Sequence, residues 1–291
     1  MAKSIANNEG AGVKRQLITG VKAAAGVLLM TFLPKRRKSI EEIATIPWHS
    51  DKSLNGVDRL IRAGILWLRS RDKSGAEMSK LHQGFWREQS ADEYYAGTAN
   101  RFEKLFLPHF DQFIDVVGHT IEQKGIRNVV EIGCGDGQLL RHLKRKVLAD
   151  RYIGLDLSKD QIKKNLEADQ EQTVEYYSGD AAQWIAENSP RSTLYVTGLG
   201  VLEYFTQSQL TSLLSNIANT FAPAAALFIE PVDKGANFIE FDESYVAGEE
   251  HSFTHNYAKR LTESGWSISH TEELHLAPYR WLVIIASCDK S

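Results

Sequence analysis

The sequence contains little cysteine. Its 291 residues include only Cys134 and Cys288, which lie far apart in the chain. Two cysteines cannot build the several disulfides that hold small secreted domains together, and these two do not form a zinc-binding pattern. The scarcity therefore indicates a reducing compartment, and we expect a cytoplasmic protein without a structural metal.

A strong charge of either sign is also lacking. The chain has 34 lysines and arginines against 37 aspartates and glutamates, a net charge of −3. Domains that bind nucleic acid are usually strongly basic, so this balance argues against DNA or RNA as a partner. Hydrophobic residues at 43% and charged residues at 24% are typical of a folded globular chain. The length suits one sizeable domain with a smaller N-terminal part.

The apolar stretch 23–33 is too short to cross a membrane, because a spanning helix needs about 20 apolar residues. A basic cluster, residues 35–38, follows the stretch, whereas a secretory signal carries its positive charge ahead of it. Apolar residues recur every three or four positions, so we expect an amphipathic helix whose stripe faces the core. The alternative is a helix that lies on a membrane surface. The stripe consists of Val13, Leu17, Val21, Ala24, Leu28 and Phe32.

From about residue 100 onward, helical patterns alternate with apolar runs of strand length. The segment 100–125 has helical periodicity and ends at Gly125. Such alternation predicts an α/β fold: a Rossmann-like, doubly wound parallel sheet of seven strands, preceded by an N-terminal helical extension. This fold places its ligand at the carboxyl ends of the strands. The strand-like runs are "NVVEIG", "RYIGLDLS", "TVEYYSG", "TLYVTGLG", "ALFIEPV", "WSISHTEEL" and "RWLVIIASC".

Three glycines at every second position follow the first of these runs, in "VVEIGCGDGQLL" (129–140). Glycine allows a ligand to approach the backbone closely at a turn between strand and helix. A dinucleotide site would need a third glycine at residue 138, where this chain has Gln138, and the acid Asp136 would repel a pyrophosphate. The spacing therefore favours S-adenosylmethionine over a nicotinamide dinucleotide, which stays as the alternative.

The motif "VVEIGCGDG" resembles the first motif of the class I S-adenosylmethionine-dependent methyltransferases, and later motifs match in order over about residues 85–288. The resemblance implies that the glycine turn holds the aminoacyl end of the cofactor, that Asp156 binds the ribose hydroxyls and that Asp180 with Ala181 reads the adenine. It also implies that "GLGVLEYF" (198–205) lines the cleft. The cofactor residues so implied are Glu131, Gly133, Cys134, Gly135, Gly137, Asp156, Leu157, Gly179, Asp180, Ala181 and Gly198.

Methyl transfer requires a general base only if the acceptor must lose a proton before it attacks. The candidate catalytic residues are Glu203, Glu230, His251 and His255, the two histidines lying in an insert, 238–257, at the place where family members often build the substrate wall. The many acids between residues 230 and 250 favour a cationic or amine-bearing acceptor, and a solvated loop is the simpler explanation. Cys134 is expected to be a small packing residue and not a nucleophile.

The acceptor expected is a small molecule that is methylated on O, N or C. The nucleic-acid branch with a D/N-P-P-Y/F motif after the fourth strand is disfavoured, because the chain has "GLGVLEYF" there. The aromatic residues Trp86, Tyr94 and Tyr95 either close over the cofactor or pack in the core. A catalytically inactive member of the family, used for binding or dimerisation, is a further alternative.

Residues 1–84 are expected to be a helical cap or a dimerisation region, and residues 85–291 the methyltransferase domain. Helices are predicted over 39–44, with Ser39 as the cap, and over 53–70. With the following "GILWLRSRDKSG" they resemble the winged-helix dimerisation module of many small-molecule O-methyltransferases. In that case a homodimer forms through the N-terminal helices.

Overall fold

The computed structural model describes residues 20–41, 44, 54–87, 102–170, 173–198, 200–237, 241–248, 250–276 and 279–289. The chain divides into two compact units, residues 1–85 with 248–251 and residues 86–247 with 252–291. We describe each unit by itself. Some residues named above lie outside the described ranges: Val13, Leu17, Tyr94 and Tyr95.

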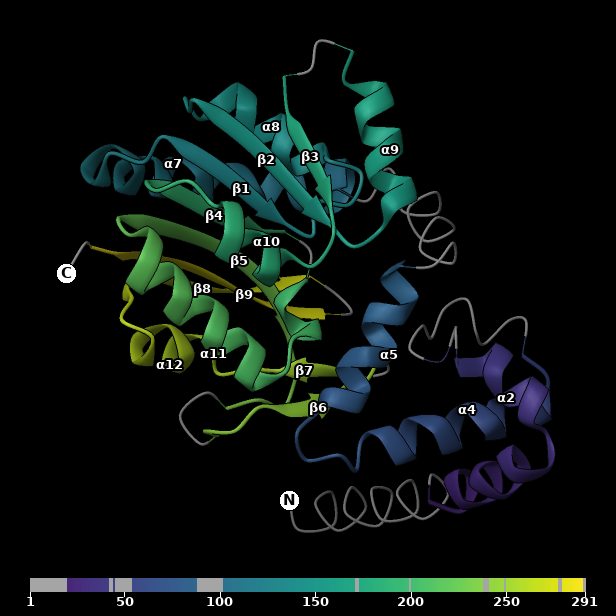
Figure 1. The fold of residues 1–291 in the computed structure, drawn as a ribbon. Helices are drawn as coiled ribbons and strands as arrows, with labels where there is room; N and C mark the ends of the chain where they lie inside the picture. Colours follow the sequence, from purple (N-terminus) through teal and green to yellow (C-terminus); the bar gives the residue numbers. More distant parts are fainter. Residues whose placement is uncertain are drawn as a thin grey trace. The chain divides into compact units, whose positions relative to one another are not determined.

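The larger unit is built on a seven-stranded sheet of order β3-β2-β1-β4-β5-β9-β8 (Figure 1). The five strands from β3 to β5 run parallel, whereas β9 pairs antiparallel with both β5 and β8. The strands are β1 (Asn128–Ile132), β2 (Arg151–Asp156), β3 (Glu175–Ser178), β4 (Thr193–Thr197), β5 (Ala224–Val232), β8 (Ser267–Leu276) and β9 (Tyr279–Cys288).

Helices cover both faces of this sheet, as Figure 1 shows. One apolar cluster joins α7, α8 and α9 to one face, and a second joins α10, α11 and α12 to the other. Adjacent strand residues alternate between the two clusters, with Val129 in the first and Val130 in the second. The helices are α7 (Leu107–Lys124), α8 (Gln138–Lys146), α9 (Lys159–Ala168), α10 (Ala181–Asn188), α11 (Gln207–Asn216) and α12 (Tyr257–Glu263), with short turns η1 (Phe102–Phe106), η2 (Leu202–Tyr204) and η3 (Ile217–Phe221).

The predicted Rossmann-like α/β sheet of seven strands is confirmed, and the wholly parallel sheet is not. The last two strands are antiparallel because only residues 277–278 separate β8 from β9, too few for the crossover that a parallel pair needs. The insert 238–257, expected to be a loop, contains a small hairpin of β6 (Tyr245–Ala247) and β7 (Ser252–Thr254). Gly125 ends α7 in the left-handed conformation, with φ of 60°, as the sequence predicted.

The smaller unit is helical throughout its described part. It consists of a helix over residues 20–32, followed by α2 (Pro34–Glu41), α4 (Gly56–Arg69) and α5 (Ala76–Arg87). The predicted wing is wrong, because residues 64–69 continue α4 and the described residues of this unit include no strand. None of the helices in the described ranges has the length and apolar character that crossing a bilayer requires.

The predicted cap at Ser39 is also wrong. The helix α2 begins at Pro34, and Ser39 lies in its last turn. Proline suits the first helical position because its missing N–H would have no partner within the helix. The Arg37 amide donates to the Leu33 carbonyl at 2.9 Å, which closes the first turn. At the next helix, α4, Asn55 is the cap, because its side chain accepts from the amides of Val57 and Asp58.

The apolar stripe of the first helix faces outward, contrary to the prediction. Val21, Leu28 and Phe32 are 69%, 62% and 72% exposed, whereas Ala23 and Met30 on the opposite side are buried. The inner side carries small residues because α4 approaches it closely. A Cβ on Gly26 would collide with the Leu60 carbonyl, and one on Gly64 would come within 2.6 Å of the Val27 amide. The two helices cross at Gly26 and Gly64, and this close crossing decides which face of the helix 20–32 is buried.

Gly26→Ala is expected to destabilise the smaller unit by about 2 kcal/mol, because the added methyl group must push the two helix backbones apart. Urea unfolding monitored by far-ultraviolet circular dichroism measures this change, because the described part of the smaller unit is helical. Gly84→Ala is the control: a Cβ there meets nothing within 4 Å, and alanine is the better helix former. Equal stability of the two variants would contradict the close helix crossing.

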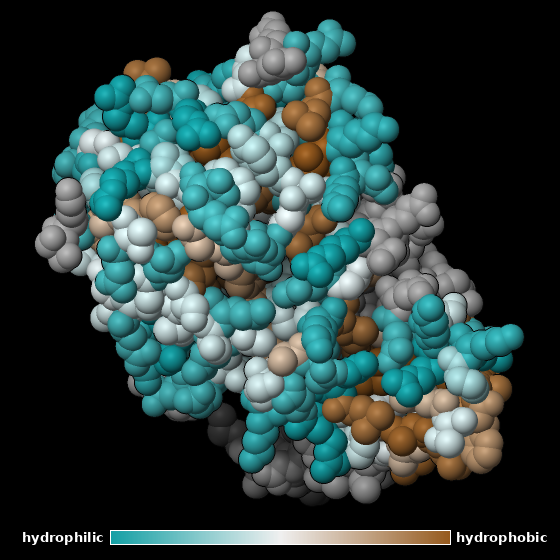
Figure 2. Space-filling model, viewed as in Figure 1, coloured by the Kyte–Doolittle hydropathy of each residue, from teal (hydrophilic) through white to brown (hydrophobic). Residues whose placement is uncertain are grey.

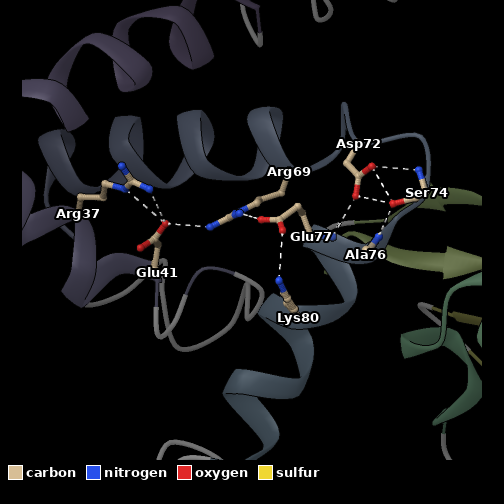
Figure 3. Close-up of polar contacts among 8 residues, drawn as sticks. All are labelled: Arg37, Glu41, Arg69, Asp72, Ser74, Ala76, Glu77 and Lys80. Atoms are coloured by element: carbon tan, nitrogen blue, oxygen red, sulfur yellow. Dashed lines mark hydrogen bonds and ion pairs between the residues drawn. The ribbon is translucent and has the colours of Figure 1, made fainter.

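A chain of alternating charges connects the three later helices of this unit (Figure 3). Arg37 and Arg69 both pair with Glu41, and Arg69 also pairs with Glu77, which in turn lies 3.6 Å from Lys80. Each member is partly exposed, so each pair contributes little free energy. The network instead favours one arrangement of α2, α4 and α5 over others.

Candidate functional site

The glycine turn follows β1 and enters α8. Gly133, Gly135 and Gly137 have φ of 68°, 49° and 72°, a backbone conformation that side chains strongly disfavour. Two of them also lack space for a side chain: a Cβ on Gly133 would come within 2.5 Å of Val201, and one on Gly137 within 2.6 Å of the Tyr176 hydroxyl. The shape of the turn itself therefore requires the alternating glycines.

Asp156, the last residue of β2, joins the neighbouring strand to this turn. Its Oδ2 accepts from the Gly135 amide at 2.9 Å and its Oδ1 from the Ser158 amide at 2.8 Å. The Cys134 amide donates to the Leu155 carbonyl at 2.9 Å, so the turn lies directly against the end of β2. The residue predicted to bind ribose hydroxyls thus also orders the glycine turn. Leu157 follows it, between β2 and the cap of α9.

The ends of β3 and β4 contribute the remaining predicted positions. Asp180 caps α10 by accepting from the Gln183 amide at 3.0 Å, and Ala181 is the first residue of that helix. At Gly179 a Cβ would meet nothing within 4 Å, so the backbone beyond β3 faces open space. Gly198 follows β4 and packs on Leu139. Because β3, β2, β1 and β4 are parallel neighbours, all these positions lie along one edge of the sheet.

Acidic groups surround the turn. Glu131 is 3% exposed, and burial together with the charges of Asp136 and Asp156 raises its pKa well above the ordinary value. The same acids and burial raise the pKa of the Cys134 thiol, which suits a packing residue and not a nucleophile. Asp136 is itself held by Gln138, whose side-chain amide donates to it at 2.6 Å. An anionic pyrophosphate is disfavoured here, and a cationic sulfonium with an ammonium group is favoured.

A family model described as a methyltransferase domain matches residues 129–224, which run from β1 to the start of β5. The chain carries a class I S-adenosylmethionine-dependent methyltransferase domain. Its cofactor is S-adenosylmethionine, which agrees with the acidic glycine turn and with the open space at Gly179. Comparison with curated proteins gives no significant sequence match.

Solved structures share the fold of this methyltransferase. Magnesium protoporphyrin IX methyltransferase from Synechocystis PCC 6803 with bound S-adenosylhomocysteine is 17% identical, with a TM-score of 0.52, over 72% of this chain and 99% of that one. Its form with S-adenosylmethionine is 16% identical, with a TM-score of 0.51, over 72% and 97%. A TehB-like methyltransferase from Corynebacterium glutamicum ATCC 13032 Kitasato is 14% identical, with a TM-score of 0.50, over 69% and 100%. These likenesses concern the fold alone.

Glu230 on β5 holds the post-β4 turn, which we define as residues 200–205. It is 1% exposed, and its Oε2 accepts from the amides of Val201 and Leu202, each at 3.0 Å. Burial raises the pKa of Glu230 to about 7, although these amides partly offset the effect. The carboxyl also lies beside Tyr257, whose hydroxyl is buried. Glu230 therefore fixes the backbone of the post-β4 turn through these two hydrogen bonds.

His255 holds the same turn from another side. It is fully buried, and burial lowers its pKa to about 4. Its Nε2 lies 3.2 Å from the Leu202 carbonyl, which can only accept, so Nε2 carries the proton. Nδ1 then accepts from the Ser244 hydroxyl at 2.6 Å. Both ring nitrogens are used in these contacts, so the neutral ring has no free lone pair.

The other two candidate bases belong to different units. Glu203, at the centre of η2, is 7% exposed and lies under Gly200, where a Cβ would collide with its Oε1. His251 lies in segment 248–251, which groups with the smaller unit, and its backbone has φ of 54°. Its carbonyl oxygen is 3.1 Å from Nε2 of His82. The structure thus brings Glu203, Glu230 and His255 together around the post-β4 turn of the larger unit, whereas His251 belongs to the smaller unit.

Trp86 makes an aromatic contact: its ring lies 5.5 Å from that of Tyr204 in the post-β4 turn. The acids between residues 230 and 250 are partly paired: Asp233 accepts from the Tyr245 hydroxyl, Asp242 pairs with Lys259, and Glu243 accepts from Gln207. Glu240 and Glu249 lie outside the described residues.

Asn165 on α9 is a site residue that the sequence reading missed. It is 2% exposed, and its side-chain amide donates to the Gly135 carbonyl at 2.7 Å, while its Oδ1 accepts from Gln161. Its only signal in the sequence is a polar pair at i and i+4, which is typical of any exposed helix face. Only the tertiary structure shows that Asn165 contacts the glycine turn, because Gly135 is 30 residues away in the chain.

Proposed function

We propose that the methyltransferase transfers the methyl group to the nitrogen of a small amine. The supporting observation is that three of the four candidate bases, Glu203, Glu230 and His255, are buried and engaged in the fold. A neutral amine is already nucleophilic and needs no base, whereas an alcohol does. Residues 88–291 carry a net charge of −12, which attracts an amine in its protonated form. That form loses a proton to solvent before the neutral nitrogen attacks, so no base of the protein is needed.

In this proposal the protein chiefly positions the reactants and excludes water. S-adenosylmethionine supplies an electrophilic methyl group on its sulfonium when it is bound. The amine nitrogen forms a bond to the methyl carbon, the carbon–sulfur bond breaks, and the nitrogen then releases its proton to solvent. The glycine turn and Asp156 would hold the cofactor, and the post-β4 turn, fixed by Glu230 and His255, would form a wall beside the acceptor.

The first experiment is isothermal titration with S-adenosylmethionine, S-adenosylhomocysteine and NADH. We expect dissociation constants of about 1–100 μM for the first two and no binding of NADH. Amines and phenols are then screened for methylated products by mass spectrometry. For an amine, the rate should rise with pH through the pKa of the acceptor itself, and His251→Gln should leave that profile unchanged.

Methylation of a phenol or alcohol would contradict the amine proposal if its rate depended on the titration of a group of the enzyme and if His251→Gln abolished that dependence. The reaction would then be a transfer assisted by a base. Cofactor binding without any product from either class would also count against it. Because cofactor binding is measured first, failure of the amine proposal can be distinguished from failure of the protein preparation.

A further inference from the structure

Charge is strongly segregated along this chain. Residues 1–87 contain sixteen lysines and arginines against seven aspartates and glutamates, a net charge of +9, although the whole chain has −3. Of the described cations between residues 20 and 41, Arg36 and Arg37 pair with acids, whereas Lys22, Lys35 and Lys38 are exposed and form no ion pair within the described residues. These three lysines keep their charge available to an external anion.

Large apolar side chains are exposed next to these lysines. Val21, Leu28 and Phe32 lie seven and four residues apart on one side of the helix 20–32, and each is more than 60% exposed. Trp67 and Leu68 of α4 add further apolar surface in the same unit. Figure 2 shows hydrophobic side chains gathered in this unit, at the lower right of the view. Soluble proteins rarely expose such sets without a partner.

We propose that the smaller unit docks on an anionic lipid bilayer through the stripe Val21, Leu28 and Phe32, with Lys22, Lys35 and Lys38 contacting the lipid phosphates. An amphipathic helix that lies in the interface inserts its apolar side chains among the acyl chains and places flanking lysines at the headgroups. Anionic leaflets attract such lysines electrostatically. The apolar stripe and the basic cluster are adjacent in the chain, as this arrangement requires.

Two other occupants fit the observations less well. A two-fold dimer would cover the apolar stripe with its own copy, but residues 20–40 contain no aspartate or glutamate that could pair with Lys22, Lys35 and Lys38 of that copy. A nucleic acid would satisfy the lysines, but phosphates and base edges give no reason to expose valine, leucine and phenylalanine together. A lipid surface alone uses both the charge and the apolar side chains.

The test is co-sedimentation of the full chain with vesicles of phosphatidylcholine, with and without about 30 mol% phosphatidylglycerol. We expect binding to the anionic vesicles that weakens as salt is raised. Leu28→Gln with Phe32→Gln should lower the partition coefficient about 10-fold or more, because the inserted apolar area is lost. Lys35→Gln with Lys38→Gln should lower it about 10-fold at low salt.

Matched controls lie in the other unit. Leu148 and Leu166 are 94% and 52% exposed, so Leu148→Gln with Leu166→Gln removes equivalent apolar surface. Lys163→Gln with Lys164→Gln removes two charges from α9, and both control pairs should bind as the unchanged protein does. Failure to bind anionic vesicles would overturn the proposal, as would binding that the controls weaken equally. Two further results would also overturn it: a solution dimer that Leu28→Gln with Phe32→Gln dissociates, or tighter binding to duplex DNA that these two changes leave intact.

Discussion

Replacement of Asp156 with alanine is expected to weaken binding of S-adenosylmethionine about 100-fold, because two hydrogen bonds to a charged acceptor are lost. The carboxylate accepts from the amides of Gly135 and Ser158 and is 6% exposed. Without it, both amides are left without their acceptor and the glycine turn loses its connection to β2. Isothermal titration measures the affinity, and urea unfolding measures the accompanying loss of stability.

Asp150→Ala is the matched control for Asp156→Ala. Asp150 immediately precedes β2, at the opposite end of the strand, and pairs with Arg127 on the surface at 2.7 Å. Its removal should change neither affinity nor stability measurably. Asp156→Asn tests the role of the charge: it keeps an acceptor oxygen for one amide but donates at the other position. If Asp156→Ala bound the cofactor normally, the assignment of this edge of the sheet as the cofactor site would be wrong.

The second large effect concerns Glu230. The pKa of Glu230 is about 7 in the folded protein, against an ordinary value of 4.5. Between pH 4.5 and about 7, Glu230 is protonated in the folded state and ionised in the unfolded state. Protonated Glu230 therefore stabilises the fold at low pH. This stabilisation is lost as the pH rises from 4.5 to about 7, and the contribution of Glu230 to the free energy of unfolding falls by about 3 kcal/mol.

His82 and His255 act in the opposite direction. Burial lowers the pKa of each to about 4, below the ordinary 6.5, so the unfolded state binds protons first as pH falls. Each histidine therefore stabilises the fold above pH 6.5 and costs stability between pH 6.5 and 4. Because wild type and Glu230 variants share both histidines, the difference between their unfolding free energies isolates the effect of Glu230.

Glu230→Gln is expected to gain about 3 kcal/mol of stability relative to wild type between pH 5 and pH 8, because the variant has no charge to bury. Glu230→Ala should instead lose about 2–4 kcal/mol at pH 5, since the amides of Val201 and Leu202 lose their acceptor and a cavity remains. Urea unfolding at four pH values distinguishes these results. Glu187→Gln, at an exposed position on α10, should follow wild type within about 0.5 kcal/mol. A Glu230→Gln difference that does not vary with pH would show that Glu230 stays protonated or solvated.

The sequence by itself determined the fold of the larger unit and predicted the position of its cofactor site. Alternating strand and helix periods define a doubly wound sheet, and the spacing of Gly133, Gly135 and Gly137 is a local requirement of one turn. Such signals are short-range, because residues within one turn or one strand fix each other's conformation. Ser39 shows the limit of such local signals: its sequence matched a helix cap, but it lies inside α2, which begins at Pro34.

Only the tertiary structure decided which face of the helix 20–32 is buried, and what the buried acids and histidines do. The apolar stripe predicted an inward face, but Gly26 and Gly64 allow so close a backbone approach that the helix packs on its small-residue side. His255 and Glu230 read as candidate bases, and their partners in the post-β4 turn lie 53 and 28 residues away along the chain. Side-chain periodicity shows that a helix has two different faces, but long-range packing decides which of them meets another element.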